Sequence, residues 1–390
     1  MARPLTVVFA HAVATVSDAL TEALAGSTTL CVVPDAPPPP NHDWPSALRL
    51  DEPVCADAAV LVATSGSTGM PRAVMLSAAA LLASAHATLR RLNGPGAWLL
   101  TLPLSSVGGL QVLVRSLMAG LHPVCLNPAA GFHADAFARA ARDLPMGVPH
   151  YTSLVPTQLR RIVDAGGAAL DALAGFDAVL IGGAPLDPEL RAAATVAGAR
   201  IVSTYGMTET SGGCVYDGIP LAGTYVEASP TGLRIGGDVV AQGYHAAPQD
   251  TRESFVDGWF LTRDAGQVAE SGLVSVTGRT DDVIISGGVN VAAGAVEEVL
   301  RERPDIADVA VLGRPDAEWG QAVIALVVPV DGVRVELAEI RAHVTARLGA
   351  AAAPREVIAL PALPRLHSGK LDRLGAQLLA AARAAPDGPR

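Results

Sequence analysis

Short apolar runs alternate with longer amphipathic stretches between residues 58 and 203, and this pattern constrains the fold more than any other feature of the chain. A buried strand is predicted at residues 59–63, and a helix at residues 77–92, where Ser77 can cap the first turn. Further strands are predicted at residues 6–9, 98–103, 124–126, 178–181 and 200–203, and further helices at residues 110–118 and 187–197. Because parallel strands need such crossover helices, the alternation predicts an α/β domain with largely parallel sheets covered by helices.

The pattern changes after Gly223, where short strands are separated by Gly, Asp and Pro turns. Strands predicted at residues 233–235, 239–240, 260–262, 267–270 and 274–278 together indicate a small antiparallel β subdomain. Beyond residues 278–282 the pattern predicts helices at residues 296–303 and 337–348 and strands at residues 309–313 and 323–329, which make a small α+β unit. We therefore predict a large N-terminal domain over residues 1–280, with residues 1–57 as a short leader, and a C-terminal domain over residues 281–390.

The net charge and the cysteines narrow the class of protein. The chain of 390 residues has a formal charge of −10, whereas nucleic-acid binding needs clustered Lys and Arg, so we expect no nucleic-acid partner. No stretch reaches the roughly 18–20 apolar residues of a membrane span, and the N-terminus shows no clear cleavage site. The cysteines, none of them in a C-x-x-C pair, are Cys31, Cys55, Cys125 and Cys214. This usage fits a reducing compartment, and we expect a cytoplasmic protein.

A loop rich in Gly, Ser and Thr directly follows the strand predicted at residues 59–63. Its backbone and hydroxyl donors could wrap the β- and γ-phosphates of a nucleotide. The loop lacks the G-x-x-x-x-G-K-[ST] spacing, so it is not a Walker A loop, and taken alone it could equally be a surface turn. The candidate nucleotide-binding residues in it are Thr64, Ser65, Gly66, Ser67, Thr68 and Gly69.

Other polar and glycine residues follow the ends of later predicted strands. Glu209 comes after the strand at residues 200–203, where a carboxylate could hold Mg²⁺ against ATP oxygens while Thr208 donates to the α-phosphate. Glycines after the strand at residues 178–181 would let a flat ring approach the backbone. Asp264 could accept hydrogen bonds from ribose hydroxyls, and Lys370 ends a Ser-Gly-Lys loop near the C-terminus. Each of these residues alone could instead be an ordinary surface or turn residue.

Taken in order, these segments resemble the motifs of the adenylate-forming superfamily, which contains acyl-CoA synthetases, firefly luciferase and adenylation domains. The resemblance covers about residues 58–375. It implies that Lys370 is the catalytic lysine and that Asp281 is the hinge of a mobile C-terminal domain. It also implies ATP and AMP contacts at Gly182, Gly183, Ala184, Thr204, Tyr205, Gly206, Met207, Thr208, Asp264 and Arg279, with Thr208 and Glu209 assisting catalysis.

The resemblance implies a two-step reaction that uses ATP, Mg²⁺ and coenzyme A. A small-molecule carboxylic acid first forms an acyl-adenylate, and the thiol of coenzyme A takes the acyl group after the C-terminal domain has rotated. Lys370 would serve the first step. Gly287 and Gly288 would line the pantetheine channel in the second step, with Gly288 as the close-packing glycine. Family members often form homodimers, and the sequence leaves that assembly open.

Within the superfamily the chain most resembles the o-succinylbenzoate–CoA ligases of menaquinone biosynthesis, in residues 109–116 and 205–218 and in its short N-terminus. Arg115 lies in the predicted apolar helix, so its buried guanidinium should have an anionic partner, either a substrate carboxylate or a protein carboxylate. The resemblance favours the substrate. The acyl-acid site that it implies comprises Ser106, Gly108, Gly109, Arg115, Gly212 and Gly213.

Two departures from the family pattern leave other functions open. The phosphate loop ends in Arg72 where lysine is usual, and Ser105 and Ser106 stand where an aromatic residue or His often shapes the acyl pocket. The alternatives are a CoA ligase for another aryl or medium-chain acid and a catalytically silent nucleotide-binding protein. An amino-acid-loading enzyme is disfavoured because no Asp occurs between residues 103 and 115, and a serine hydrolase because no G-x-S-x-G motif occurs.

Overall fold

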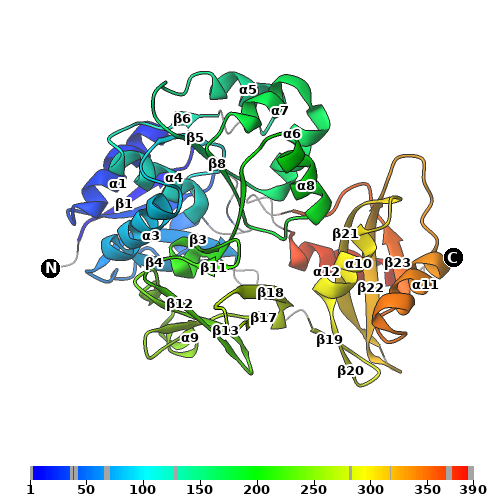
Figure 1. Ribbon diagram of the computed structural model, residues 1–390. Helices are drawn as coiled ribbons and strands as arrows, with labels where there is room; N and C mark the ends of the chain where they lie inside the picture. The colour runs from blue at the N-terminus through cyan, green and yellow to red at the C-terminus, as the bar shows by residue number, and fades with distance from the viewer. Residues whose placement is uncertain are drawn as a thin grey trace. The chain divides into compact units, whose positions relative to one another are not determined.

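The computed structural model describes residues 3–35, 38, 43–65, 71–126, 131–280, 283–316, 318–365 and 371–384 (Figure 1). The chain divides into two compact units. The first comprises Met1–Glu227, Arg234–Leu261 and Ala269–Val274, and the second comprises Ala228–Leu233, Thr262–Val268 and Ser275–Arg390. The predicted boundary between residues 280 and 281 adjoins residues outside the description and stays a prediction. Among the described helices, none is both long and apolar enough to cross a membrane.

A five-stranded sheet in the first unit has the order β1-β2-β3-β4-β14. Its strands are β1 (Leu5–Phe9), β2 (Thr29–Val33), β3 (Ala58–Ser65), β4 (Pro71–Ser77) and β14 (Gly243–Tyr244). β1, β2 and β3 are parallel, and β4 and β14 are antiparallel to their neighbours. The prediction of a leader is wrong for the described residues before β3, because β1 and β2 belong to this sheet and helix α1 (Val13–Leu24) packs in its core. Leu5 pairs with Thr29 although helix α1 lies between them in the sequence, and local sequence patterns do not reveal such a pairing.

A seven-stranded sheet in the order β11-β10-β9-β8-β7-β5-β6 contains the predicted β–α–β alternation. Its strands are β5 (Ala97–Leu100), β6 (Val124–Cys125), β7 (His150–Leu154), β8 (Ala178–Ile181), β9 (Ile201–Met207), β10 (Gly212–Tyr216) and β11 (Ile219–Pro220). β5 to β9 are parallel, which confirms the predicted sheet. Its helices are α3 (Ala78–Arg91), α4 (Val107–Met118), α5 (Ala134–Ala141), α6 (Pro156–Ala165), α7 (Gly167–Ala174) and α8 (Pro188–Val196).

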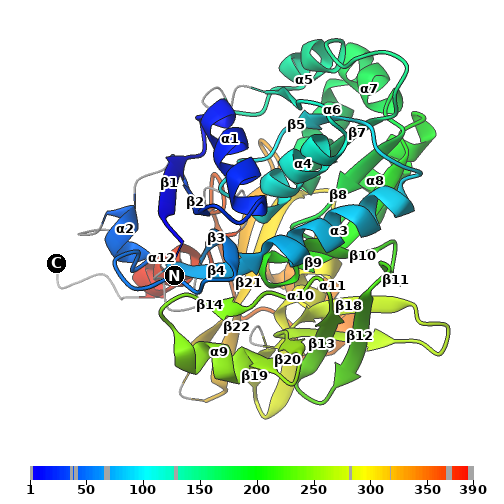
Figure 2. The same cartoon turned by 90° about the vertical axis from the view of Figure 1, so that its left-hand side faces the viewer.

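Side chains alternate between the two faces of this sheet, so each face has its own apolar core. Trp98 packs with α3 and α4, whereas Leu99 packs with α5 to α8. Figure 2 shows α3 and α4 running alongside one another. The α3 start is as predicted, because Ser77 Oγ accepts a hydrogen bond from Ala80 N at 3.1 Å. α4 begins at Val107 rather than at residue 110, because Ser106 supplies the cap.

A small sheet follows in the order β12-β13-β16-β15. Its strands are β12 (Thr224–Ser229), β13 (Gly232–Gly237), β15 (Phe255–Val256) and β16 (Trp259–Leu261), and helix α9 (Pro248–Ser254) precedes β15. The strand predicted at residues 239–240 is wrong, because Val240 N donates to the Gly237 carbonyl at 3.2 Å within a turn. Next, β17 (Asp264–Val268) pairs with β18 (Val274–Arg279), so the strand expected at residues 267–270 begins earlier.

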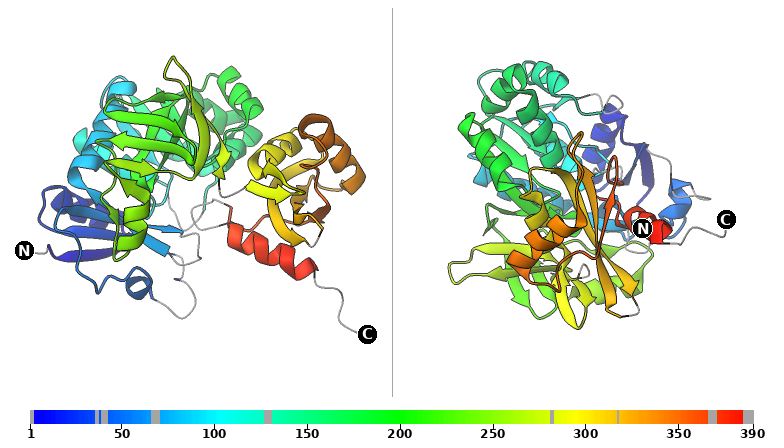
Figure 3. Two further views of the ribbon diagram at one scale, coloured as in Figure 1. Left: turned by 90° about the horizontal axis from the view of Figure 1, so that it is seen from below. Right: turned by 90° about the vertical axis from the view of Figure 1, so that its right-hand side faces the viewer.

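The main sheet of the second unit has the order β20-β19-β22-β21, with β23 beside β22. Its strands are β19 (Val283–Ser286), β20 (Val289–Ala292), β21 (Ile306–Asp316), β22 (Gly320–Pro329) and β23 (Glu356–Ala359). Helices α10 (Ala293–Arg301) and α11 (Leu337–Leu348) cover the face that contains Val311, and α12 (Arg373–Ala384) covers the face that contains Leu312. Figure 3 shows α12 apart from α10 and α11. This confirms the predicted α+β character of the segment.

Candidate active site

The carboxyl ends of the neighbouring strands β8 and β9 bring two groups of predicted nucleotide contacts together. Thr204 Oγ1 donates a hydrogen bond to the carbonyl of Ile181 at 3.1 Å. A Cβ atom on Gly182 would lie 2.4 Å from that hydroxyl oxygen, so a side chain does not fit there. Gly183 and Ala184 follow in an exposed loop. Residues 182–184 and 204–207 therefore share one edge of the sheet, as the expected order of parallel strands requires.

A tight turn between β9 and β10 presents Thr208 and Glu209. Residues Thr208–Thr210 form a short 3₁₀ turn, in which Thr210 Oγ1 accepts a hydrogen bond from Met207 N at 3.0 Å and donates to the Gly212 carbonyl at 2.8 Å. A Cβ atom on Gly206 would lie 2.1 Å from the same carbonyl oxygen. The close approach of the two strands thus requires glycine at position 206 and sets the positions of the residues in the turn.

The Glu209 carboxylate is held by a tyrosine from another strand. Tyr244 Oη donates a hydrogen bond to Glu209 Oε1 at 3.0 Å. Burial, and next the charge of Glu209, raises the pKa of Tyr244 above its usual range, so the hydroxyl remains a donor. The described residues contain no group of three His, Cys, Asp or Glu side chains that could hold a metal ion. One carboxylate combined with phosphate oxygens is a donor set that Mg²⁺ prefers, so Glu209 fits the magnesium role.

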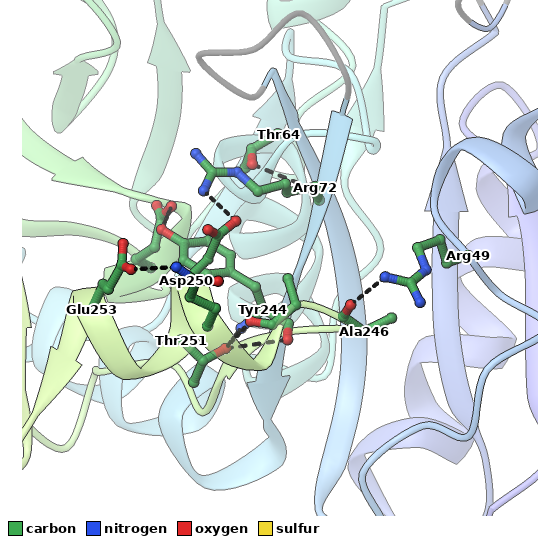
Figure 4. Close-up of polar contacts among 11 residues, drawn as sticks. Arg49, Thr64, Arg72, Tyr244, Ala246, Asp250, Thr251 and Glu253 are labelled. Atoms are coloured by element: carbon green, nitrogen blue, oxygen red, sulfur yellow. Dashed lines mark hydrogen bonds and ion pairs between the residues drawn. The ribbon is translucent and has the colours of Figure 1, made fainter.

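Arg72, at the end of the Gly/Ser/Thr loop, contacts three parts of the first unit (Figure 4). Its main-chain carbonyl accepts a hydrogen bond from Thr64 Oγ1 at 3.3 Å, across the β3–β4 pair. Its Nη1 atom donates to Asp250 Oδ2 at 2.9 Å. Its guanidinium carbon lies 4.8 Å from the centre of the Tyr244 ring. The cation that replaces the usual lysine is therefore engaged by an aspartate and an aromatic ring.

Some predicted residues lie outside the part of the chain that the structure describes. These are Gly66, Ser67, Thr68, Gly69, Asp281 and Lys370. The backbone of Ser65 is described and pairs with Pro71 at the end of β3. The roles of the loop, the hinge and the catalytic lysine stay predictions.

Arg115 is buried, with 3% of its surface exposed, and its guanidinium lies over an aromatic ring. Its guanidinium carbon lies 5.0 Å from the centre of the Trp98 ring. Its Nε atom has no hydrogen-bond partner among the described residues, and burial lowers its pKa. No described carboxylate forms an ion pair with it. Of the two partners expected for this cation, the protein carboxylate is not found in the described part of the chain.

The other predicted acyl-site residues lie at the start of α4 and in β10. Ser106 Oγ accepts from Gly109 N at 3.2 Å and donates to the Pro103 carbonyl at 2.8 Å, so it acts as a helix cap. A Cβ atom on Gly109 would lie 2.2 Å from that carbonyl oxygen, and one on Gly212 would lie 3.3 Å from Gln111. A Cβ atom would also lie 3.0 Å from a neighbouring side chain at Gly108 and at Gly213. These glycines allow close packing, and their contact with an acyl group stays a prediction.

The two predicted ribose contacts lie side by side in the second unit. Asp264 begins β17 and Arg279 ends β18, and Arg279 Nη1 lies 3.7 Å from Asp264 Oδ1. Asp264 N donates to Thr262 Oγ1 at 3.0 Å, which orients the start of the strand. A carboxylate and a guanidinium placed together in this way could share the two hydroxyls of a ribose.

The turn between β19 and β20 contains the two glycines predicted for the coenzyme A channel. They border a hollow of about 650 Å³, whose wall also includes Trp319 and Gln321. A Cβ atom on Gly287 would lie 2.8 Å from the Trp319 ring, whereas no described atom lies within 4 Å of one on Gly288. Gly287 therefore packs against Trp319 of the β21–β22 connection, and the close packing of Gly288 against the pantetheine arm stays a prediction.

Tyr244, Asp250 and Trp98 contact predicted site residues from distant segments and were not predicted from the sequence. In the sequence Tyr244 is an aromatic residue next to Gly243, and nothing local indicates a partner for the tyrosine hydroxyl. Tyr244 meets Glu209 only because β14 joins the edge of the first sheet beside β4. Such contacts depend on strand order, which a single sequence does not specify.

Comparisons with known proteins agree with this arrangement of motifs. The family model of the AMP-binding enzyme matches residues 5–241, and that of the AMP-binding enzyme C-terminal domain matches residues 295–370. A probable 2-succinylbenzoate–CoA ligase of Mycobacterium tuberculosis is 44% identical over 377 residues, which cover 95% of this chain and 96% of that protein. An indoleacetate–CoA ligase of Aromatoleum aromaticum is 32% identical over 393 residues, covering 91% of this chain and 74% of that protein.

Among solved structures, the o-succinylbenzoate CoA synthetase of Bacillus subtilis in complex with an acyl-adenylate intermediate is similar with a TM-score of 0.75. The identity is 24%, and the match covers 99% of this chain and 84% of that one. At this identity the likeness shows the fold. Its two-part architecture agrees with the α/β fold predicted from the sequence.

Proposed function

The chain belongs to the family of AMP-binding enzymes, as its motifs implied, and from this premise we propose that it is an ATP-dependent acid–CoA ligase. The observation that supports the proposal most strongly is the edge formed by the ends of β8 and β9. There Glu209 is held by Tyr244, and Arg72, at the base of the Gly/Ser/Thr loop, lies over the same tyrosine. The edge thus combines room for a flat ring at Gly182 with a carboxylate suited to a metal–nucleotide complex.

In the first step a carboxylate oxygen of the acid attacks the α-phosphorus of ATP, the bond to the β-phosphate oxygen breaks, and pyrophosphate leaves. The carboxylate is already a nucleophile, so the protein has to position it and neutralise charge. Thr208 would donate to the α-phosphate, residues 64–69 would hold the β- and γ-phosphates, and Lys370 would approach the transferred group. Asp264 and Arg279 would bind the ribose. Mg²⁺ held by Glu209 would neutralise charge on the phosphate oxygens.

In the second step the thiol sulfur of coenzyme A attacks the acyl carbon, the bond from that carbon to the phosphate oxygen of AMP breaks, and AMP leaves while the thiol proton passes to solvent. We propose that residues 281–390 rotate as a lid between the two steps, with Asp281 as the hinge. Lys370 would then leave the nucleotide. The turn at Gly287 and Gly288 would approach the acyl-adenylate and border the path of the pantetheine arm.

The acid that we propose is 2-succinylbenzoate, which would place the chain in menaquinone biosynthesis. The relative from Mycobacterium tuberculosis supports this choice through its identity over nearly the whole chain. Arg115 supports it through chemistry: it is a buried cation without a carboxylate partner among the described residues. 2-Succinylbenzoate has two carboxylates, so one can be activated while the other neutralises Arg115.

A CoA ligase for another aryl acid is the second candidate. The indoleacetate–CoA ligase of Aromatoleum aromaticum supports it, because that relative covers most of this chain. Ser106 acts as a helix cap and Ser105 is buried, so neither offers the aromatic wall that many relatives have. A cytoplasmic location, a homodimer and the lack of a nucleic-acid partner also stay predictions.

ATP–pyrophosphate exchange over a panel of acids tests the proposal, because it measures the first step without coenzyme A. The panel comprises o-succinylbenzoate, benzoate, octanoate and a mixture of amino acids. Exchange with o-succinylbenzoate alone supports the proposed acid, and exchange with another acid preserves the enzyme class but rejects the acid. Absence of exchange with every acid, together with measurable ATP binding, would favour a silent nucleotide-binding protein.

A further inference from the structure

Among the described residues, the hydroxyl of Tyr244 donates a hydrogen bond to the Glu209 carboxylate. Glu209 belongs to the turn after β9, whereas Tyr244 belongs to β14 and pairs with Val74 of β4. A glutamate side chain has three rotatable bonds, so a carboxylate without such a donor would sample many positions. The hydrogen bond therefore restricts Glu209 at the place where a metal–nucleotide complex would bind.

The Tyr244 ring is itself held in place. It is 6% exposed and meets the Phe255 ring edge-on, with 5.5 Å between the ring centres. Its main-chain N–H donates to Thr251 Oγ1 at 2.9 Å, which ties β14 to helix α9. The Arg72 guanidinium lies over the ring, with its carbon 4.8 Å from the centre.

Arg72 is oriented by Asp250 in the first turn of α9, through the ion pair at 2.9 Å (Figure 4). A guanidinium is planar, so it can lie flat over an aromatic ring and donate to a carboxylate from its edge at the same time. A lysine ammonium is a compact charge and lacks the extended guanidinium that makes both contacts here. This geometry gives a physical reason for arginine at a position where lysine is usual in the family.

We propose that Tyr244 is a positioning residue for the Glu209 carboxylate, and that the Arg72–Asp250 pair fixes the ring that presents its hydroxyl. The inference rests on the proposed function, since it assumes that Glu209 binds Mg²⁺ with ATP. Hydrogen-bond partners of metal ligands set the orientation of those ligands, and their removal costs about tenfold to a hundredfold in metal affinity. Tyr244→Phe keeps the ring and removes only the donor.

The test is Mn²⁺ binding to the protein–ATP complex, measured by electron paramagnetic resonance on the full chain. We expect Tyr244→Phe to raise the half-saturating Mn²⁺ concentration about tenfold. This is the lower end of the range for removing a hydrogen-bond partner of a metal ligand. Tyr151→Phe is the matched control: it removes the buried bond from Tyr151 Oη to the Leu92 carbonyl at 2.7 Å and should leave Mn²⁺ binding unchanged. Thermal melting of both variants checks that they are folded.

Arg72→Lys keeps the charge and removes the guanidinium that lies over the Tyr244 ring, so we expect a smaller rise in the same direction, about threefold for a partial loss of orientation. Wild-type Mn²⁺ affinity in a folded Tyr244→Phe variant would overturn the inference. Should that variant not fold, wild-type affinity in both Arg72→Lys and Asp250→Asn would overturn it instead. A wild-type protein that binds ATP but no metal, and exchanges no pyrophosphate, would overturn the proposed function and the inference together.

Discussion

Replacing Arg115 with methionine should make the protein more stable and a poorer binder of its acid. Arg115 is a buried cation with no described carboxylate beside it, and its Nε atom lacks a described partner. A methionine side chain is unbranched, somewhat shorter and uncharged, so it removes the unfavourable burial of the guanidinium. If Arg115 binds a substrate carboxylate, the substitution must raise the free energy of unfolding and weaken binding of the acid.

The size of the stability change follows from three contributions. An uncompensated buried charge costs about 3–5 kcal/mol. The desolvated cation–π contact with Trp98, in which the guanidinium carbon lies 5.0 Å from the ring centre, offsets about 2 kcal/mol of this cost. The shorter methionine leaves a small void that costs about 1 kcal/mol. We therefore expect Arg115→Met to raise the free energy of unfolding by about 1 kcal/mol, which is a rise of about 2 °C in Tm.

Urea unfolding and steady-state kinetics measure the two effects on the same preparation. The KM for 2-succinylbenzoate should rise about tenfold to a hundredfold, as expected for a lost hydrogen bond to a charged group, while the KM for ATP stays unchanged. Arg90→Met, on the exposed side of α3, is the control and should change stability by less than about 0.5 kcal/mol. A variant that is less stable than wild type and has an unchanged KM for the acid would show that Arg115 is structural and binds no substrate carboxylate.

Three further results are expected. Gly206→Ala should lose several kcal/mol of unfolding free energy and most pyrophosphate exchange, because its Cβ atom would lie 2.1 Å from the Gly212 carbonyl oxygen; urea unfolding and the exchange assay check this. Lys370→Ala should abolish adenylation and leave thioester formation from a supplied acyl-adenylate largely intact, and equal loss of both steps would contradict the domain rotation. Burial raises the pKa of Cys31 to about 12, and that of Cys214 likewise, so Ellman's reagent at pH 8 should titrate only the two exposed thiols before unfolding and all four afterwards.

Local chemistry in the sequence was enough to predict the elements whose signals lie within one segment. Ser77 was a recognisable helix cap, and its side chain accepts the expected hydrogen bond from a backbone N–H group of its helix. The order of strands β5, β7, β8 and β9 was not specified, yet the rule that ligands bind at the carboxyl ends of parallel strands placed Gly182 and Glu209 at one edge. These predictions needed only periodicity and the chemistry of turns.

Predictions failed where a distant segment supplies the decisive neighbour. The strand expected at residues 239–240 is a turn, because apolar side chains there serve packing rather than pairing. The contact of Trp319 with Gly287 was not predicted, because this tryptophan comes from another hairpin. Tyr244 went unnoticed because its role depends on β14 joining β4, a pairing between residues far apart in the chain. A single sequence contains no local signal for such contacts.

The most direct test of the central claim is mass spectrometry of the product formed from ATP, Mg²⁺, coenzyme A and o-succinylbenzoate. We expect a coenzyme A thioester of this acid, formed together with AMP and pyrophosphate, and much less thioester from benzoate or octanoate under the same conditions. Pyrophosphate release without any thioester would contradict the second step. A thioester formed only from another acid would contradict the role of Arg115 and the assignment of the substrate.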